Sequence, residues 1–208
     1  MDHLRLRAIY ALDVARFAVF RARHRGRLWI EGAGSPNLRL TDLRIEPGGR
    51  FHVGPGFATE RKRGNHIWVQ EGGELRLDRA VWLRTEHGPN HITVFPGARI
   101  SVGSGTLVNG AMLHSKCEIT LGEDVLVGWG VRIVDADMHP LDRETPERQA
   151  PVRIGDRVWI AADVSVLRGV EIGEDTVVGA RSVVTRDLPP RVLALGHPAK
   201  PVREISRR

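Results

Sequence analysis

The chain has 208 residues, a formal net charge of +6 and a single cysteine. That length is enough to bury one sizeable core without disulfides, and one cysteine excludes an internal disulfide framework, which favours a reducing compartment. The sequence has no run of about 18 apolar residues and no recognisable signal peptide, so we expect a cytoplasmic protein.

Basic residues crowd the two ends of the chain. Arginines are frequent in the first 27 residues, and the carboxyl-terminal group consists of Arg186, Lys200, Arg203, Arg207 and Arg208. Such charge directs attention to nucleic acid, an anionic membrane or a polyanionic small molecule. Nothing resembles a zinc finger, a helix-turn-helix core or an aromatic RNA-reading strand pair, so we expect no nucleic-acid partner.

Residues 3–25 predict a helix. The apolar stripe that we expect to pack comprises Leu4, Ala8, Ala11, Leu12, Ala15, Val19 and Ala22. The first interpretation is a helix that caps the open end of a repeat structure. The second is a basic amphipathic helix that makes a peripheral contact with an anionic membrane, at its inner face, through residues 3–27.

From Ile154 the sequence divides into hexads: IGDRVW, IAADVS, VLRGVE, IGEDTV, VGARSV and VTRDLP. Each hexad begins with a branched aliphatic residue, and its fifth place is small or branched in all but the last. Neither a helix nor an ordinary alternating strand has this period. Six residues per strand and corner fit a left-handed parallel β-helix, in which three hexads form one triangular coil and the leading aliphatic residue points inward.

The same period continues upstream with slips. Leu121, Val127 and Ile133 lead three hexads; one residue out of phase, Val102 and Val108 lead two more, and His114 falls at the next leading position. A histidine there could face the groove of a neighbouring subunit, or the phase could slip again. We expect irregular early coils that begin between residues 28 and 50.

A polar segment interrupts the hexads after Ile133. His139 falls where another aliphatic leader belongs, and burying it without partners would be costly. We therefore expect the chain to leave the coil from Asp135 to about Gln149. Long insertions of this kind in a regular repeat are more often functional than accidental.

These observations predict an all-β solenoid with an amino-terminal helix. We expect a basic helix over residues 1–27, a left-handed β-helix over 28–188 with a catalytic loop at 134–153, and a carboxyl-terminal extension over 189–208. Prolines stop the coil in the extension, and the run VREI predicts a short strand or helix that folds back.

Residues 96–205 resemble the hexapeptide-repeat acetyltransferases, of the galactoside and maltose O-acetyltransferase type, and their relatives that modify bacterial surface polysaccharides. The resemblance rests on RIGDRVWIAADVSVLRGVEIGEDTVVGARSVVTRDLPP and on GHPAKPVREI. It implies a homotrimer with acetyl-coenzyme A (acetyl-CoA) in the groove between subunits. By motif, the implied cofactor-binding residues are Ala162, Ala180, Thr185, Arg186, Lys200 and Arg203. Arg186 stands where the family often has Lys, which retains the charge that coenzyme A phosphates require.

The resemblance also assigns catalytic residues. His139 matches the family's catalytic histidine; a neutral imidazole with a pKa near 6.5 can remove the proton of an acceptor hydroxyl. Direct attack on the thioester needs no acyl-enzyme, so Cys117 is not a nucleophile. Asp135 or Asp137 could orient the imidazole, bind sugar hydroxyls, or form a solvated acidic turn.

Two further residues have implied roles. Asn109 matches the acceptor-site polar residue of the family, although Gly110 competes for that place because the alignment is off by one. Trp159, in the VWI motif, is expected to lie in a groove or subunit interface rather than in the core.

The implied activity is acetyl-CoA-dependent O-acetylation of a sugar hydroxyl, in surface polysaccharide or lipopolysaccharide biosynthesis. N-acetylation of an amino sugar or nucleotide sugar, and a non-catalytic trimeric scaffold, remain alternatives. A zinc enzyme of the β-helical carbonic anhydrase type would need three converging histidines, and His87 and His91 are not in register with His114 or His139, so we expect no metal.

Overall fold

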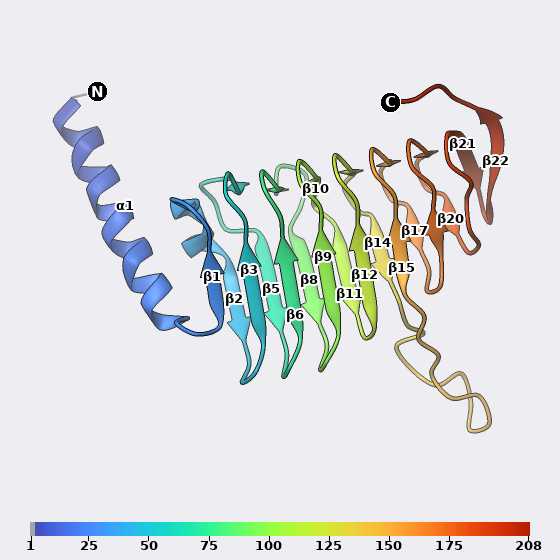
Figure 1. Ribbon diagram of the computed structural model, residues 1–208, viewed down its shortest axis with the longest axis horizontal. Helices are drawn as coiled ribbons and strands as arrows, with labels where there is room; N and C mark the ends of the chain where they lie inside the picture. The colour runs from blue at the N-terminus through green and yellow to red at the C-terminus, as the bar shows by residue number, and fades with distance from the viewer. Residues whose placement is uncertain (1–2) are drawn as a thin grey trace.

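The computed structural model describes residues 3–208, with side chains from residue 11 onward. A helix, α1 (His3–Arg23), precedes a stack of short strands, and a 3₁₀ helix, η1 (Pro36–Leu40), follows the first strand. In Figure 1 the strands form successive coils along one axis, with α1 leaning away from one end and the carboxyl-terminal hairpin at the other.

The strands form three sheets, here named A, B and C. Sheet A contains β1 (Leu28–Ile30), β3 (Arg50–Val53), β6 (Glu74–Leu77), β9 (Arg99–Val102), β12 (Glu118–Leu121), β15 (Val152–Ile154) and β18 (Glu171–Ile172). Sheet B contains β2 (Asp42–Ile45), β5 (Asn65–Val69), β8 (Asn90–Val94), β11 (Met112–Ser115), β14 (Arg132–Val134), β17 (Ser165–Val166) and β20 (Val183–Val184). Sheet C contains β4 (Ala58–Thr59), β7 (Trp82–Arg84), β10 (Leu107–Asn109), β13 (Leu126–Val127), β16 (Trp159–Ile160), β19 (Val177–Val178), β21 (Val192–Gly196) and β22 (Ala199–Glu204).

From β3 to β20 the chain visits sheets A, C and B in turn, so each strand pairs with the strand one coil away. The pairing is parallel throughout, except between β21 and β22 at the carboxyl-terminal end. The expected all-β parallel architecture with one amino-terminal helix is confirmed.

Branched aliphatic side chains fill the interior of the coil. The six hexad leaders from Ile154 to Val184 are at most 3% exposed. Ile154 pairs with Ile172 on sheet A, and equivalent leaders pair on the other sheets, so like residues stack from coil to coil. Because burial of each such side chain contributes about 1.5–3 kcal/mol, the interior position has to be filled on every coil, and this requirement sets the period of the sequence.

Coil length changes along the stack. In the late part Ile154 pairs with Ile172, a step of three hexads, whereas in the early part Leu75 pairs with Ile100, a longer step. The early coils are longer because the turns between sheets C and B hold extra residues, at 60–64 and 85–89. The hexad count therefore holds strictly only in the late coils.

The phase slips once more at His114. Leu113 is fully buried and occupies the interior position, whereas His114 is only partly buried on the outer face of sheet B. The step from the buried Val108 to Leu113 is one residue shorter than a hexad, and Gly110 turns this shorter corner with a φ of +59°. The expectation that His114 leads a hexad was wrong by one residue.

The three outer faces differ in chemistry. On sheet A, opposite charges alternate from coil to coil in the ladder Arg50, Glu74, Arg99 and Glu118. On sheet C, an apolar column consists of Ala58, Trp82, Leu107, Leu126, Trp159, Val177 and Leu193. The charged ladder of sheet A is compatible with exposure to solvent, whereas a half-exposed apolar column of this length is typical of a surface that binds a partner.

Helix α1 contacts the stack through a face that the sequence stripe did not predict. Asp13 and Phe17 are buried and Phe20 is half-buried, whereas the stripe members of the described segment, Ala11, Leu12, Ala15, Val19 and Ala22, are exposed. The stripe was wrong because Asp13 forms ion pairs with Arg39 at 2.6 Å and Arg61 at 2.9 Å, which orient the helix. Over the described residues, no helix is long and apolar enough to cross a membrane.

At the other end, β22 folds back antiparallel on β21, as the VREI run predicted. Parallel pairing with the stack continues past residue 188, since Leu193 of β21 pairs with Val177. Arg157 holds this end: it donates to Asp175 at 2.8 and 3.1 Å, and Asp175 also accepts from the backbone of Arg208 at 3.0 Å.

Candidate active site

The polar insertion leaves the stack at the edge between sheets B and A, which we name the B–A edge. In Figure 1 it projects from the stack between β14 and β15. Its two ends are joined: Ala136 and Gln149 form an antiparallel bridge, and the Asp137 N–H donates to the Arg148 carbonyl at 3.0 Å. The loop therefore begins and ends at one fixed point of the coil.

Asp135 fixes the base of this loop. Its buried carboxylate accepts hydrogen bonds from the Ser115 hydroxyl at 2.6 Å and from the backbone N–H groups of Lys116 and Cys117 at 2.8 and 2.9 Å. These three donors lie at the end of β11 and in the turn that follows it, one coil earlier, so Asp135 ties the loop to the stack. Burial raises the pKa of the neighbouring Cys117 thiol, which disfavours a thiolate there.

Asp137 lies on the outer side of the loop base. It accepts from the Arg168 guanidinium at 2.5 Å, and Arg148 lies 3.6 Å away. The hydrogen bond with Arg168 lowers the pKa of Asp137, so it is a carboxylate at neutral pH. Among the described residues, neither Asp135 nor Asp137 is hydrogen-bonded to His139, and an orienting role for either stays a prediction.

His139 is exposed and follows a residue in an uncommon backbone conformation. Met138 has a φ of +68°, in the left-handed region that few side chains adopt. The Lys116 ammonium holds this turn, because it donates to the Met138 carbonyl at 3.2 Å and pairs with Glu147 at 2.8 Å. The loop thus presents the imidazole to solvent from an anchored segment.

A cavity of about 440 Å³ lies beside the loop base on the B–A edge. It is lined by Val134, Ala136, Asp137, Met138, Leu167, Arg168 and Thr185. The structure therefore brings the predicted cofactor residue Thr185 next to the segment that carries His139. Arg186, the next residue, is exposed on the same edge.

Other predicted residues lie on the edge where the chain passes from sheet C to sheet B, the C–B edge. Asn109 ends β10 there and is 7% exposed; its amide nitrogen lies 3.4 Å from the His87 ring, and its buried amide oxygen has no protein partner in the described structure. His87 in turn stacks on Trp129 with ring centroids 4.8 Å apart. An unsatisfied buried acceptor beside two exposed rings is suited to a hydroxyl-bearing ligand.

The C–B edge continues into the predicted cofactor positions. The Asp163 N–H donates to the Trp129 carbonyl, and the Arg181 N–H donates to the Ala162 carbonyl, both at 2.9 Å, so the corners of successive coils adjoin. Ala162 and Ala180 occupy these corners on neighbouring coils. Their small side chains leave the backbone of the edge accessible.

The remaining predicted residues lie near the carboxyl-terminal end of sheet C. Lys200 and Arg203 are exposed on β22, and Trp159 is 43% exposed in the apolar column, with the Arg208 guanidinium 5.5 Å from the centre of its ring. Trp159 thus lies outside the core, as expected.

One chain therefore carries two half-sites. His139 and Thr185 belong to the B–A edge, and Asn109, Ala162 and Ala180 belong to the C–B edge, on opposite sides of sheet B.

Sequence reasoning did not find Lys116, Arg168, His87 and Trp129. Lys116 and Arg168 read as ordinary surface charges, because their partners are distant in the sequence. His87 could be placed beside Asn109 only from the pairing of strands in successive coils, because the early coils are longer than three hexads. His87 stacks on Trp129 and His91 stacks on His66, and residues 11–208, whose side chains the structure describes, contain no group of three metal-ligand side chains.

Comparison with known proteins identifies relatives of this chain. Residues 151–186 match the family model "Bacterial transferase hexapeptide (six repeats)". The galactoside O-acetyltransferase of Escherichia coli K12 is 34% identical over 117 residues, which cover 54% of this chain and 57% of that protein. The chain spans about half the length of the curated relatives that it matches, between 44% and 59% for three of them.

Two solved structures are similar over more of the chain. A maltose O-acetyltransferase from Clostridium difficile 630 is 31% identical, with 66% of this chain and 70% of that one covered and a TM-score of 0.50. A hexapeptide-repeat acetyltransferase from Vibrio cholerae O1 biovar eltor, solved with acetyl-CoA, shares the fold at 21% identity, with 94% and 88% covered and a TM-score of 0.54. The chain belongs to the hexapeptide-repeat acetyltransferase family.

Proposed function

We propose that this protein is an acetyl-CoA-dependent O-acetyltransferase that acts on a sugar hydroxyl, with His139 as general base. The observation that carries the proposal is the loop of the B–A edge, which holds an exposed imidazole on a segment anchored by Asp135 and Lys116. We also assign a left hand to the coil, a cytoplasmic location, and a pathway of surface polysaccharide or lipopolysaccharide synthesis, as expected for this family.

The residues present fit acetyl-CoA. Ala162 and Ala180 leave an accessible edge for a slender chain, and the exposed cations Arg186, Lys200 and Arg203 are suited to phosphates. Acetyl-CoA, when bound, supplies the acetyl group as an activated thioester. His139 removes the proton of the acceptor hydroxyl as its oxygen attacks, and Asn109 positions the acceptor through its unpaired amide oxygen.

We propose a homotrimer, because the half-sites of one chain lie on different edges. A head-to-tail contact joins the C–B edge of one copy to the B–A edge of the next, and three such contacts close a ring. The apolar column of sheet C adjoins the C–B edge and supplies the partner surface, with Trp82, Leu126 and Trp159 between 38% and 43% exposed.

The assay that tests the activity measures coenzyme A release with a panel of neutral sugars, amino sugars and nucleotide sugars. His139→Ala should lower the rate by a factor of about 10²–10⁴ through loss of the general base. Leu141→Ala is the matched control, since Leu141 is 81% exposed in the same loop. Full rate in His139→Ala would overturn the assignment, and transfer confined to amines would establish the N-acetyltransferase alternative.

The cofactor tail has its own test. Lys200→Glu combined with Arg203→Glu should weaken coenzyme A binding in calorimetry and leave the trimer intact, because both residues are exposed on β22. Unchanged affinity would remove the tail from the site, and absence of any coenzyme A binding by the wild type would support the scaffold alternative.

Helix α1 favours a peripheral membrane contact, because its outward face combines exposed Leu12 and Val19 with Arg16 and Arg23. Binding to vesicles that contain anionic lipid, lost at high salt, is expected. Equal binding to neutral vesicles would contradict the electrostatic part of this proposal.

A further inference from the structure

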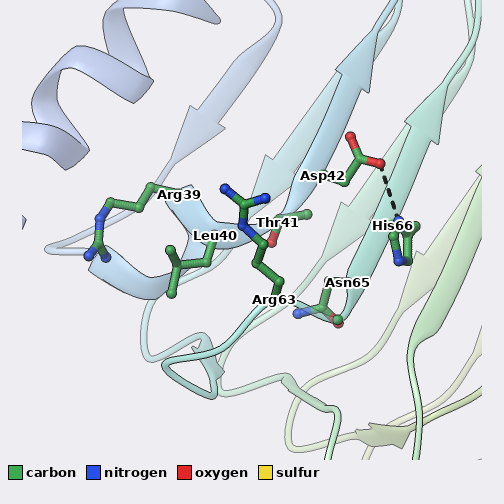
Figure 2. A pocket seen from close by; sticks show the side chains of 8 residues that line it. Arg39, Leu40, Thr41, Asp42, Arg63, Asn65 and His66 are labelled. Carbon is green, nitrogen blue, oxygen red and sulfur yellow. Dashed lines mark hydrogen bonds and ion pairs between the residues drawn. The ribbon is translucent and has the colours of Figure 1, made fainter.

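A second cavity, which lies on the C–B edge, is not used by the proposed reaction. It has a volume of about 480 Å³ and is lined by Arg39, Leu40, Thr41, Asp42, Arg63, Gly64, Asn65 and His66. Figure 2 shows these residues between η1, the start of β2 and the start of β5. Ligand sites of about 300–1,000 Å³ hold small molecules, so the cavity has room for a sugar or a sugar phosphate.

The cavity contains an unsatisfied hydroxyl. Thr41 is 8% exposed, and its hydroxyl oxygen has no hydrogen-bond partner among the side chains that the structure describes, those of residues 11–208. A buried polar group without a partner costs about 1–3 kcal/mol, which a ligand that donates to or accepts from it recovers. The adjoining Asn65 is satisfied by Thr59 and Asn90, so Thr41 is the group in need of a partner.

The cavity also has unpaired positive charge. Of the basic run Arg61, Lys62 and Arg63, only Arg61 pairs with a carboxylate of residues 11–208, that of Asp13. In Figure 2 the Arg63 side chain extends across the cavity toward Thr41. A guanidinium beside a hydroxyl matches the geometry of a carboxylate or phosphate group.

The walls of the cavity are held in place from outside. Asp13 of α1 bridges Arg39 of η1 and Arg61 of the 60–64 turn at 2.6 and 2.9 Å. On the opposite rim, the Asp42 carboxylate lies 3.2 Å from the His66 ring. The rim thus offers a carboxylate acceptor for hydroxyls in the same cavity as the exposed Arg63 guanidinium.

The position of the cavity relates it to the acceptor. The turn with Arg63, the turn with His87 and the corner at Asn109 follow one another on the C–B edge, because β5 pairs with β8 and β7 pairs with β10. Two coil steps of about 4.8 Å place Arg63 roughly 10 Å along the edge from Asn109. That distance corresponds to the next groups of an extended ligand rather than to a separate site.

We propose that the cavity between Thr41 and Arg63 binds an anionic group carried by the acceptor, so that the acceptor is an acidic glycan or a phosphate-bearing sugar. This inference rests on the proposed function for the identity of the ligand as acceptor. The carboxylate of a uronic acid and the phosphate of a nucleotide sugar share the required chemistry, and the experiment separates them.

The test is equilibrium binding to the full chain without donor. The probes are an oligosaccharide that contains hexuronic acid, the same oligosaccharide with its carboxyl groups reduced to alcohols, and a nucleoside diphosphate sugar. We expect the wild type to bind one of the anionic probes at least about tenfold more tightly than the reduced one, since a charge-assisted hydrogen bond contributes that much. The anionic probe that binds identifies the source of the charge.

Variants locate the binding. Arg63→Glu should abolish the preference for the anionic probe, and Thr41→Val should weaken binding of that probe several-fold. Arg79→Glu, the same change at an exposed arginine on the edge between sheets A and C, should keep the preference. Circular dichroism and thermal unfolding verify that all three variants are folded.

Two outcomes overturn the proposal: equal binding of the reduced and anionic probes by the wild type, or an anion preference that persists in folded Arg63→Glu. Failure of the enzymatic proposal is recognised separately. If no acceptor is acetylated but the preference and its dependence on Arg63 hold, the activity is wrong and the anion site stands. If acetylation occurs without the preference, the anion site alone is wrong.

Discussion

At the scale of single residues, the structure separates two aspartates that look alike in the sequence. Asp135 is completely buried with three donors, whereas Asp137 lies at the surface with Arg168. The acidic motif before His139 therefore combines an anchor for the loop with a surface ion pair. Spacing alone could not show this, because the donors to Asp135 come from the previous coil.

Asp135→Asn should lower the free energy of unfolding by about 1–3 kcal/mol, because an NH₂ group, which cannot accept, replaces one of the two carboxylate oxygens that accept from backbone N–H groups. Urea unfolding measures the change. Glu144→Gln is the control, because this exposed loop carboxylate accepts no hydrogen bond among the described residues, and it should shift stability by less than about 0.5 kcal/mol. A variant that keeps full stability and loses only activity would instead assign a chemical role to Asp135.

At the scale of elements, each coil is stabilised by packing against the coils on either side of it. Leu121 of β12 is 1% exposed and pairs with Val102 on one side and Ile154 on the other. Leu121→Ala should therefore lower the free energy of unfolding by about 2–5 kcal/mol. The truncated side chain leaves a cavity that three coils line, and these coils cannot move together to fill it. Thr120→Ala, on the outer face of the same strand, should cost little; similar losses in both variants would contradict the stacking account.

Element prediction from the sequence was best where the coil is shortest. The hexad leaders from Ile154 to Val184 could be predicted because each of them pairs with the leader three hexads away, so the sequence period equals the structural one. Upstream, longer turns changed the count, and His114 was placed one residue out of phase because the step from Val108 to Leu113 is one residue shorter than a hexad. The packing face of α1 was not predictable, because the ion pairs of Asp13 depend on Arg39 and Arg61, which lie far along the chain.

At the scale of the whole molecule, the sheet C column predicts assembly. Leu126→Glu places a charge in the middle of this column and should convert the proposed trimer to monomers in size-exclusion chromatography with light scattering. Ser101→Glu, on the outer face of sheet A, is the control and should remain trimeric. A trimeric Leu126→Glu would exclude this column from the interface.

The fold also predicts how stability depends on pH. Burial lowers the pKa of His91 and His114 below the ordinary value of 6.5, with smaller contributions from His66 and His91 respectively. The unfolded chain therefore takes up protons near pH 6.5 that the folded chain binds less well, so stability falls as the pH drops through this region. Thermal unfolding between pH 7.5 and 5.5 should show this decline, and His91→Asn with His114→Gln should reduce it; an identical slope in the variant would assign the decline to other groups.

A second decline is expected in acid. The hydrogen bond with Arg157 lowers the pKa of Asp175 below 3.8, so this carboxylate stabilises the fold above that pH and ceases to do so as the pH falls through its lowered pKa. Loss of the carboxyl-terminal end before the rest of the stack should appear as early hydrogen exchange in β21 and β22 below pH 4.

The residues of the candidate site could be named from the sequence, but their arrangement in space could not. His139, Thr185, Asn109, Ala162 and Ala180 were named from motifs, yet only the coil shows that they divide between two edges of one chain. The division follows from three-fold rotation of the strands, which a linear spacing does not display until every turn length is known.

The bridge between Ala136 and Gln149 makes the loop structurally independent of the coils that follow it. Since its ends meet before the chain rejoins the stack, insertions and deletions inside it leave the register of every later coil unchanged. Evolution, or an engineer, can therefore exchange this segment to alter what the enzyme accepts without having to rebuild the scaffold beneath it.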